Sequence, residues 1–257
     1  MKLDVCLEMV FTDLPPEERI PKIAAAGYDA VEFWMPDGKN LDAVRDAARR
    51  CKVTINNMVV NGPGGPLLGV AAEQQQYVAR VEETIAIGKR IGCRQAITCT
   101  CNDLPGVSHA QTHAAVVRAL AVAAEVAARH DFVLLLEPLN TRADHKGYFL
   151  DSVDEGAEIV REVKSPGLKL LFDIYHVQIM QGDLIRRIEQ HLDVIGHFHS
   201  AGVPGRHELF DGEIHYPAIV KRHEALGYAG FFGLEYAPAL ADHAESLRRV
   251  KAYLLGG

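Results

Sequence analysis

LKLLFDIYHVQIMQG, residues 168–182, begins with an apolar run typical of a buried strand and then presents two polar side chains. Asp173 ends the run, and His176 follows three residues later. An ionised carboxylate inside a protein is costly unless it is paired or binds a metal ion. This stretch therefore predicts a core strand with functional side chains at its carboxyl end. We expect a fold whose functional site lies at the ends of its strands.

Strand-like and helix-like segments alternate along the chain. Short runs rich in β-branched or apolar residues occur at 3–9, 29–34, 53–60, 95–100, 132–137, 168–173, 194–199 and 230–235. Segments with helical spacing lie near 15–26, 40–51, 71–91, 108–130, 153–163, 183–191, 216–226 and 242–254. Ser108 with Gln111 has the pattern of a capping box, and Ser152 precedes acidic residues at the start of another helix.

Eight strand–helix units predict a parallel sheet, and at this chain length they favour a closed (β/α)₈ TIM barrel. We expect one such domain over residues 1–257. An open doubly wound sheet is the alternative, but it would usually carry a glycine-rich phosphate-binding turn after an early strand. The glycine-rich stretch NGPGGPLLG, residues 61–69, has neither the Walker nor the dinucleotide pattern.

Four consecutive predicted strands end in a side chain that can bind a metal ion, namely Glu137, Asp173, His199 and Glu235. The carboxyl ends of the strands form the active-site face of a TIM barrel, so these side chains should converge. Each one alone could be a solvated or helix-capping residue, but their equivalent positions favour a shared site. One imidazole and three carboxylates suit one divalent ion such as Mn²⁺, Mg²⁺ or Co²⁺.

Composition argues against several other classes of protein. The formal net charge is −7, with 27 basic and 34 acidic residues, and no basic stripe could track a nucleic-acid backbone. The first residues, MKLDVCLEMVF, have the pattern of neither a signal peptide nor a membrane span. Five cysteines, an odd number, indicate reduced thiols. We therefore expect a cytoplasmic protein with no nucleic-acid or membrane partner, and leave a homo-oligomeric state open.

The second half of the chain resembles the hydroxypyruvate isomerase family, within the wider group of xylose-isomerase-like barrels that includes the ketose 3-epimerases. The first half resembles it only in general terms. The resemblance rests on LLEPLNTRADHKGYFL (135–150), LKLLFDIYHVQIMQGDL (168–184), IGHFHSAGVPGRHEL (195–209), GEIHYP (212–217) and FGLEY (232–236).

This resemblance implies roles for particular residues. Glu137, Asp173, His199 and Glu235 fall where the family places its metal ligands, and Glu137 and Glu235 also fall where it places its acid/base carboxylates. His176 and Arg206 match residues that hold substrate oxygens. Hydroxypyruvate isomerases usually have Gln where this chain has His199, whereas the ketose 3-epimerases have His. The resemblance therefore implies a small keto-acid or ketose substrate without deciding between them.

Other polar and aromatic residues receive separate predictions from their positions alone. Trp34 ends the second predicted strand and should form an apolar wall for the substrate, and His145 lies in a loop where it could touch the substrate. We expect Glu32 to be a buried hydrogen-bonding residue near the barrel floor, and His197 to point away from the site face towards a supporting partner.

Three functions follow from these observations. The first is isomerisation of hydroxypyruvate to tartronate semialdehyde, in which a metal ion stabilises an enediolate and carboxylates move the proton. The second is 3-epimerisation of a free ketose, which His199 favours. The third, an abasic-site endonuclease, would need a positive groove and several His-rich metal sites, which the composition does not supply. A barrel that only binds sugar would leave the two glutamates without a use.

Overall fold

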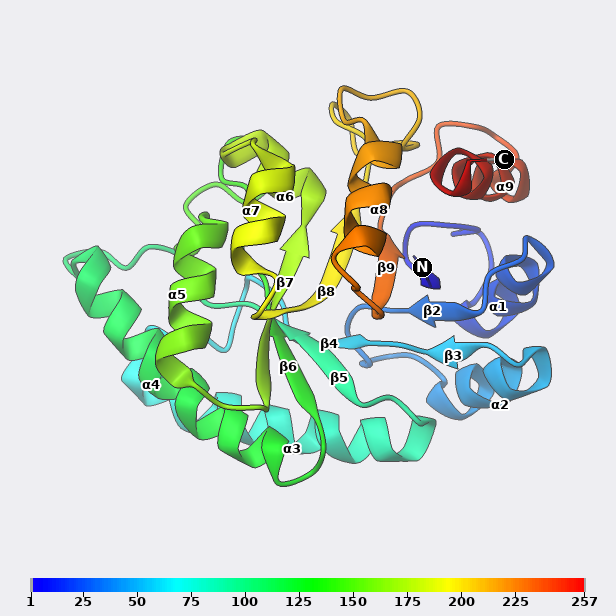
Figure 1. Ribbon diagram of the computed structural model, residues 1–257. Coiled ribbons are helices and arrows are strands. Elements are labelled where there is room, and N and C mark those ends of the chain that lie inside the picture. The colour runs from blue at the N-terminus through cyan, green and yellow to red at the C-terminus, as the bar shows by residue number, and fades with distance from the viewer. Residues whose placement is uncertain (1, 257) are drawn as a thin grey trace.

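Nine parallel strands form one curled sheet in the computed structural model, which describes residues 2–256 (Figure 1). The strands are β1 (Lys2–Cys6), β2 (Ala30–Glu32), β3 (Thr54–Ile55), β4 (Met58–Asn61), β5 (Gln95–Thr98), β6 (Val133–Leu136), β7 (Leu168–Asp173), β8 (Ile195–Ser200) and β9 (Phe231–Leu234). Their order is β3-β2-β1-β9-β8-β7-β6-β5-β4. The two end strands, β3 and β4, are consecutive in the chain, so the sheet closes on itself as the predicted TIM barrel.

Helices follow the strands and lie around the outside of the sheet (Figure 1). They are α1 (Pro16–Ala25), α2 (Leu41–Cys51), α3 (Gln74–Ile91), α4 (His109–Ala128), α5 (Val153–Val163), α6 (Ile174–Met180), α7 (Leu184–His191), α8 (Tyr216–Ala225) and α9 (His243–Leu255), with a short 3₁₀ helix at Ala71–Glu73. The capping box of Ser108 and Gln111 is present at the start of α4, and Ser152 caps α5. Within residues 2–256, none of the helices combines the length and the apolar character that crossing a membrane requires.

The expected continuous strand at 53–60 is wrong, because the strand is interrupted at Asn56 and Asn57. Both of these side chains bond to buried acids, Asn56 Nδ2 to Asp4 Oδ2 at 2.6 Å and Asn57 Nδ2 to Glu32 Oε2 at 2.5 Å. Consecutive side chains of a regular strand point to opposite faces. The break lets two neighbouring residues serve two acids inside the barrel. The chain beyond the break still bonds to the segment that follows β2, since Val59 N–H donates to the carbonyl of Trp34.

The barrel interior has an apolar half and a polar half. Val59, Ile97, Leu135 and Leu171, from β4 to β7, form a small buried apolar cluster distinct from the larger core. On the opposite side the buried residues include Asp4, Glu32, Asn57 and His197. Because side chains alternate along a strand, the residue two positions after each of these inward residues also faces inward. Leu135 thus precedes Glu137, Leu171 precedes Asp173, and His197 precedes His199, which brings the predicted ligands to the carboxyl end of the interior.

Candidate active site

The four predicted metal ligands meet at the carboxyl end of neighbouring strands. Asp173 is the last residue of β7, His199 lies near the end of β8, and Glu137 and Glu235 directly follow β6 and β9. These four strands are adjacent in the sheet. All four side chains are buried, and one ligand atom from each lies within 4.8 Å of those of the others. Sequence reasoning therefore identified a cluster that the fold assembles.

The cluster has the donor chemistry of a divalent cation site. His199 Nδ1 is buried and has no hydrogen-bond partner, although it lies 3.4 Å from Glu235 Oε2 and 3.9 Å from Glu137 Oε1. Burial, together with the neighbouring carboxylates of Glu235 and Asp173 and against the opposing charges of His199 and Arg206, raises the pKa of Glu137 to about 8. Burial likewise raises the pKa of Asp173. A cation would satisfy the free nitrogen and neutralise this crowded negative charge, so the residues fit such an ion.

Glu235 is held through both of its carboxylate oxygens. The indole N–H of Trp34 donates to Oε1 at 2.7 Å, and the guanidinium of Arg206 pairs with Oε2. Burial pushes the pKa of Glu235 upwards, but the charges of Arg206 and His199 outweigh it and lower the pKa to about 2. Trp34 was expected only as an apolar wall. The indole N–H adds a polar role that the sequence did not indicate, because the two residues are far apart in the chain.

Arg206 is fixed by the loop that follows β8. Its backbone N–H donates to the carbonyl of Gly202 at 2.9 Å, and its φ of 57° lies in the left-handed region that non-glycine residues seldom adopt. The guanidinium lies over the ring of Tyr175, 5.1 Å from its centroid, and Nη2 lies 3.8 Å from Asp173 Oδ2. The loop therefore holds one cationic fork beside two members of the cluster.

His176 lies in α6, a helix that the sequence analysis missed. Asp173 begins this helix, since its Oδ1 accepts the backbone N–H groups of Tyr175 and His176 at 2.7 and 3.3 Å. The signal was present, because Asp is a favoured N-cap residue. His176 Nδ1 accepts the backbone N–H of Asn140 at 3.2 Å, so the ring proton belongs on Nε2, 3.5 Å from Asp173 Oδ2. Burial, followed by the charge of Arg206, lowers the pKa of His176 well below its usual value and keeps the ring neutral.

A cavity of about 230 Å³ opens beside the cluster and has both polar and apolar lining residues. The polar lining contains five of the predicted site residues, Glu137, His145, His176, Arg206 and Glu235. The apolar lining is formed mostly by Trp34, Met35, Val59, Ile97, Cys99 and Leu139, with the loop residues Gly62 and Pro63. Trp34 is 40% exposed, and the ring of His145 packs on that of His176 with centroids 5.5 Å apart. Both residues predicted to touch a substrate from position alone thus line this cavity.

Two residues lie behind the cluster, and the predicted orientation of one of them is wrong. His197 was expected to point away from the site, but it points into the barrel, because it lies two positions before His199 on the same strand. Glu32 is buried and hydrogen-bonded as expected, yet it reaches His199 itself, with Oε1 3.0 Å from His199 Nε2. The sequence could not reveal this contact, since it depends on how the barrel closes.

The barrel and its buried cluster define an α/β barrel enzyme, and comparison with known proteins identifies its family. Residues 20–253 match the model of the xylose isomerase-like TIM barrel family, and the chain belongs to that family. Its relatives are isomerases, and the chain is an enzyme of that class. A human protein named putative hydroxypyruvate isomerase is 33% identical over 247 residues, covering 91% of this chain and 88% of that protein. A 2-oxo-tetronate isomerase of Cupriavidus necator is 33% identical over 254 residues, covering 96% of each.

Solved structures show the same architecture. A Brucella melitensis protein described as an AP endonuclease, family 2, superposes with a TM-score of 0.90 at 28% identity, covering 98% of this chain and 99% of that one. A D-psicose 3-epimerase from Clostridium cellulolyticum superposes with a TM-score of 0.79 at 16% identity, covering 100% and 97%. The latter likeness concerns the fold alone.

Proposed function

We propose that the protein is a metal-dependent isomerase that moves the carbonyl group of a small hydroxy-keto acid by one carbon. Hydroxypyruvate, converted to tartronate semialdehyde, is the first choice of substrate. The observation that carries this proposal is the Arg206 guanidinium, held beside Glu235 at a cavity whose other lining residues are mostly apolar. The names of the human and Cupriavidus necator relatives support the same class of reaction.

Glu137, Asp173, His199 and Glu235 would hold one divalent ion, Mn²⁺, Mg²⁺ or Co²⁺. When bound, such an ion neutralises the negative charge that develops on substrate oxygens as a proton leaves carbon.

The chain's own side chains then divide the remaining work. One of Glu137 and Glu235 removes a proton from the hydroxyl-bearing carbon, and the other returns a proton to the former carbonyl carbon. The proton of the hydroxyl group passes to the former carbonyl oxygen, so that a carbonyl forms where the hydroxyl group was. His176 is neutral with its proton on Nε2, so it can donate a hydrogen bond to a substrate oxygen without adding charge. Arg206 can grip a carboxylate through two parallel hydrogen bonds. Trp34 and His145, which line the same cavity, would both contact the substrate.

A ketose 3-epimerase is the second candidate, because His199 matches the residue that those enzymes carry at this position. Its chemistry would use the same carboxylates. A free sugar carries hydroxyl groups on both sides, and those facing Trp34, Met35, Val59 and Ile97 would lack partners. A site that leaves polar substrate groups unpaired disfavours that substrate. The apolar lining of the cavity therefore favours a short keto acid whose carboxylate group binds Arg206.

An endonuclease function, which the name of the Brucella melitensis protein suggests for that protein, is less compatible with this chain. Its net charge is −7. Recognition of nucleic acid depends on basic groups that neutralise phosphates.

The proposal is tested by measuring kcat/KM for hydroxypyruvate, D-fructose and D-tagatose in the wild type, Arg206→Ala and Arg206→Lys. Loss of a bidentate, charge-assisted contact costs roughly 1.5–3 kcal/mol, which is about tenfold or more in KM for the keto acid. Lysine should rescue poorly because an ammonium group has no planar fork. Arg206 also contacts Glu235, so a common fall in kcat is expected for every substrate, and the difference between keto acid and ketose is the informative quantity.

Arg161→Ala is a matched control, since Arg161 pairs with Asp193 on the outside of the barrel and should leave all three substrates unaffected. Chelation should abolish turnover, and Mn²⁺ should restore it. A wild type that turns over only ketoses would establish the epimerase instead. Full turnover in the metal-free protein would contradict the metal requirement.

A further inference from the structure

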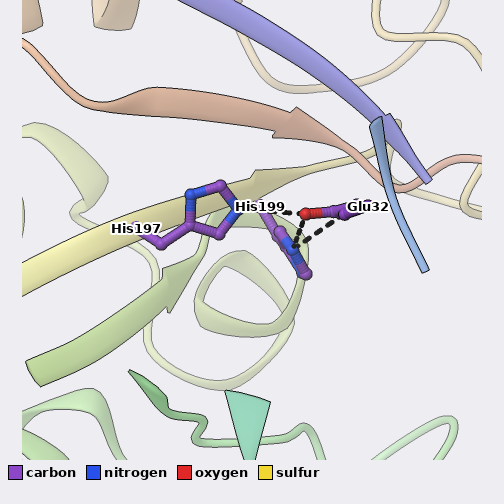
Figure 2. Close-up of side chains that lie close together, drawn as sticks. All are labelled: Glu32, His197 and His199. Atoms are coloured by element: carbon purple, nitrogen blue, oxygen red, sulfur yellow. Dashed lines mark hydrogen bonds and ion pairs between the residues drawn. The ribbon is translucent and has the colours of Figure 1, made fainter. Parts of the chain in front are cut away.

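The carboxylate of Glu32 faces the two histidines of β8 in the polar half of the barrel (Figure 2). Its Oε1 is 3.0 Å from His199 Nε2, and its Oε2 is 3.2 Å from His197 Nε2. The two imidazole rings meet edge to face with centroids 4.9 Å apart. Each of these three side chains is at most 2% exposed, so water cannot replace any of the contacts.

Glu32 is itself held by the interruption between β3 and β4. Asn57 Nδ2 donates to Glu32 Oε2 at 2.5 Å, on the same oxygen that faces His197. His199 Nε2 faces the same carboxylate, 3.2 Å from Oε2 and 3.0 Å from Oε1. A regular strand at 53–60 would not place Asn57 in this way next to Asn56, which bonds to Asp4. The strand break thus fixes the orientation of the Glu32 carboxylate.

This arrangement decides which nitrogen of His199 faces the carboxylate cluster. An imidazole that donates its Nε2–H to a buried carboxylate presents Nδ1 to whatever lies on its other side. That other side holds Glu235 Oε2 at 3.4 Å and Glu137 Oε1 at 3.9 Å, and Nδ1 has no hydrogen-bond partner. We propose that Glu32, held by Asn57 and His197, is a positioning residue that fixes the His199 ring so that Nδ1 ligates the ion of the proposed isomerase site. This inference rests on the proposed metal site.

A second cation shared by Glu32, His197 and His199 is a weaker interpretation, although their ligand atoms also lie within 4.8 Å of one another. The amide nitrogen of Asn57 lies 2.5 Å from Glu32 Oε2 and 3.2 Å from His197 Nε2. A cation there would face an N–H donor, which repels it. The group is therefore better described as a hydrogen-bonded support than as a metal centre.

The decisive variant is Glu32→Gln, which keeps the shape but replaces one acceptor oxygen by an amide N–H donor. Three donors, from Asn57, His197 and His199, then compete for one oxygen, and the His199 ring is free to rotate or to change its tautomer. We expect the dissociation constant for Mn²⁺, measured by titration calorimetry, to rise by about 10- to 100-fold. The visible absorption spectrum of the Co²⁺-loaded protein should change as well, because it reports the geometry of the ligands.

Asp154→Asn is the matched control. It makes the same carboxylate-to-amide change against a buried histidine, His191, whose Nε2 lies 2.7 Å from Asp154 Oδ1, but between α5 and α7 and away from the cluster. Its Mn²⁺ affinity and Co²⁺ spectrum should equal those of the wild type. Asn57→Ala keeps the Glu32 carboxylate and removes one of its supports, so it should weaken Mn²⁺ binding by a smaller factor.

Each outcome has a separate meaning. Wild-type protein that binds no Mn²⁺ would refute the metal site of the proposed function. Wild-type binding that Glu32→Gln leaves unchanged, with the same Co²⁺ spectrum, would overturn only the positioning role. If Glu32→Gln does not fold, Asn57→Ala decides the matter, and wild-type affinity in that variant would again overturn the proposal. Weakened Mn²⁺ binding with the thermal stability of the metal-free protein retained would support it.

Discussion

At the scale of single residues, Glu235 is the carboxylate on which most groups of the site act. Trp34 bonds one oxygen, Arg206 bonds the other, and His199 lies 3.4 Å from the latter. These contacts prevent the side chain from turning and leave it ionised. A fixed, ionised carboxylate at the rim of the cavity is suited to removing a proton from a bound substrate.

Glu235→Gln separates the proton-transfer role from metal binding. The amide keeps an oxygen that can ligate an ion but cannot accept a proton, so Mn²⁺ binding should partly survive while kcat falls by about 10²- to 10⁴-fold. Glu137→Gln should behave similarly, and steady-state kinetics beside Mn²⁺ titration measures both. Glu155→Gln, outside the barrel where Glu155 pairs with His109 and His113, is the control for a lost carboxylate. If either site variant keeps more than about a tenth of the wild-type kcat, that residue is not the acid/base group.

Sequence reasoning reached the residues that strand periodicity could place, and missed those that depend on closure of the barrel. Glu137, Asp173, His199 and Glu235 were found because each ends a predicted strand on its inward face. Trp34 was found by the same argument, but its bond to Glu235 joins segments that follow β2 and β9, which are not neighbouring strands. The contact between Glu32 and His199 likewise joins β2 to β8, which are not neighbours in the sheet. Such pairs share no local pattern.

At the scale of secondary structure, the eight predicted strands match the barrel, with one of them divided into β3 and β4. The division could not be predicted, because VTINNMVV has the composition of an ordinary strand. The interruption allows its two asparagines to form hydrogen bonds with the buried acids Asp4 and Glu32, which are distant in the sequence. The helix α6 was missed because its residues are as apolar as the strand before it. Its N-cap, Asp173, was attributed to metal binding alone, whereas it also accepts two backbone N–H groups.

Strand β9 contributes to the site through a residue that lacks a side chain. Gly233 pairs in register with His199, and a Cβ at this position would lie 2.7 Å from His199 Cδ2 and 3.0 Å from His197 Nε2. Gly233→Ala should therefore displace both rings, destabilise the metal-free protein by about 1–3 kcal/mol and weaken Mn²⁺ binding. Urea unfolding and calorimetry test this expectation. Gly64→Ala, whose Cβ would meet open space, should change neither quantity. Wild-type stability and affinity in Gly233→Ala would show that the two rings have more room than their contacts imply.

At the scale of the whole molecule, the closed sheet separates two kinds of buried polar group. Those inside the barrel include Glu32, Asn57, His197 and His199, whose side chains contact one another. One group outside the barrel is different. His223 of α8 is buried among Phe198, Tyr228 and Phe232, and neither of its ring nitrogens has a hydrogen-bond partner. Burial lowers the pKa of His223 to about 4.

That depressed pKa makes the unfolding free energy depend on pH in a defined window. An unfolded histidine binds a proton below about pH 6.5, whereas the folded protein binds one at His223 only near pH 4. The unfolded state therefore binds more protons between these values, and stability falls as the pH is lowered through them. Acidification to pH 4.5 therefore lowers the free energy of unfolding by roughly 2–3 kcal/mol through His223.

His223→Leu removes the titrating group and two unpaired polar atoms, so it should be about as stable as the wild type at pH 7 and more stable at pH 4.5. Urea unfolding of the metal-free wild type and variant at both pH values measures this as a double difference, in which other titrating groups cancel. An equal loss of stability in the two proteins on acidification would show that His223 is already protonated, or solvated, in the folded state.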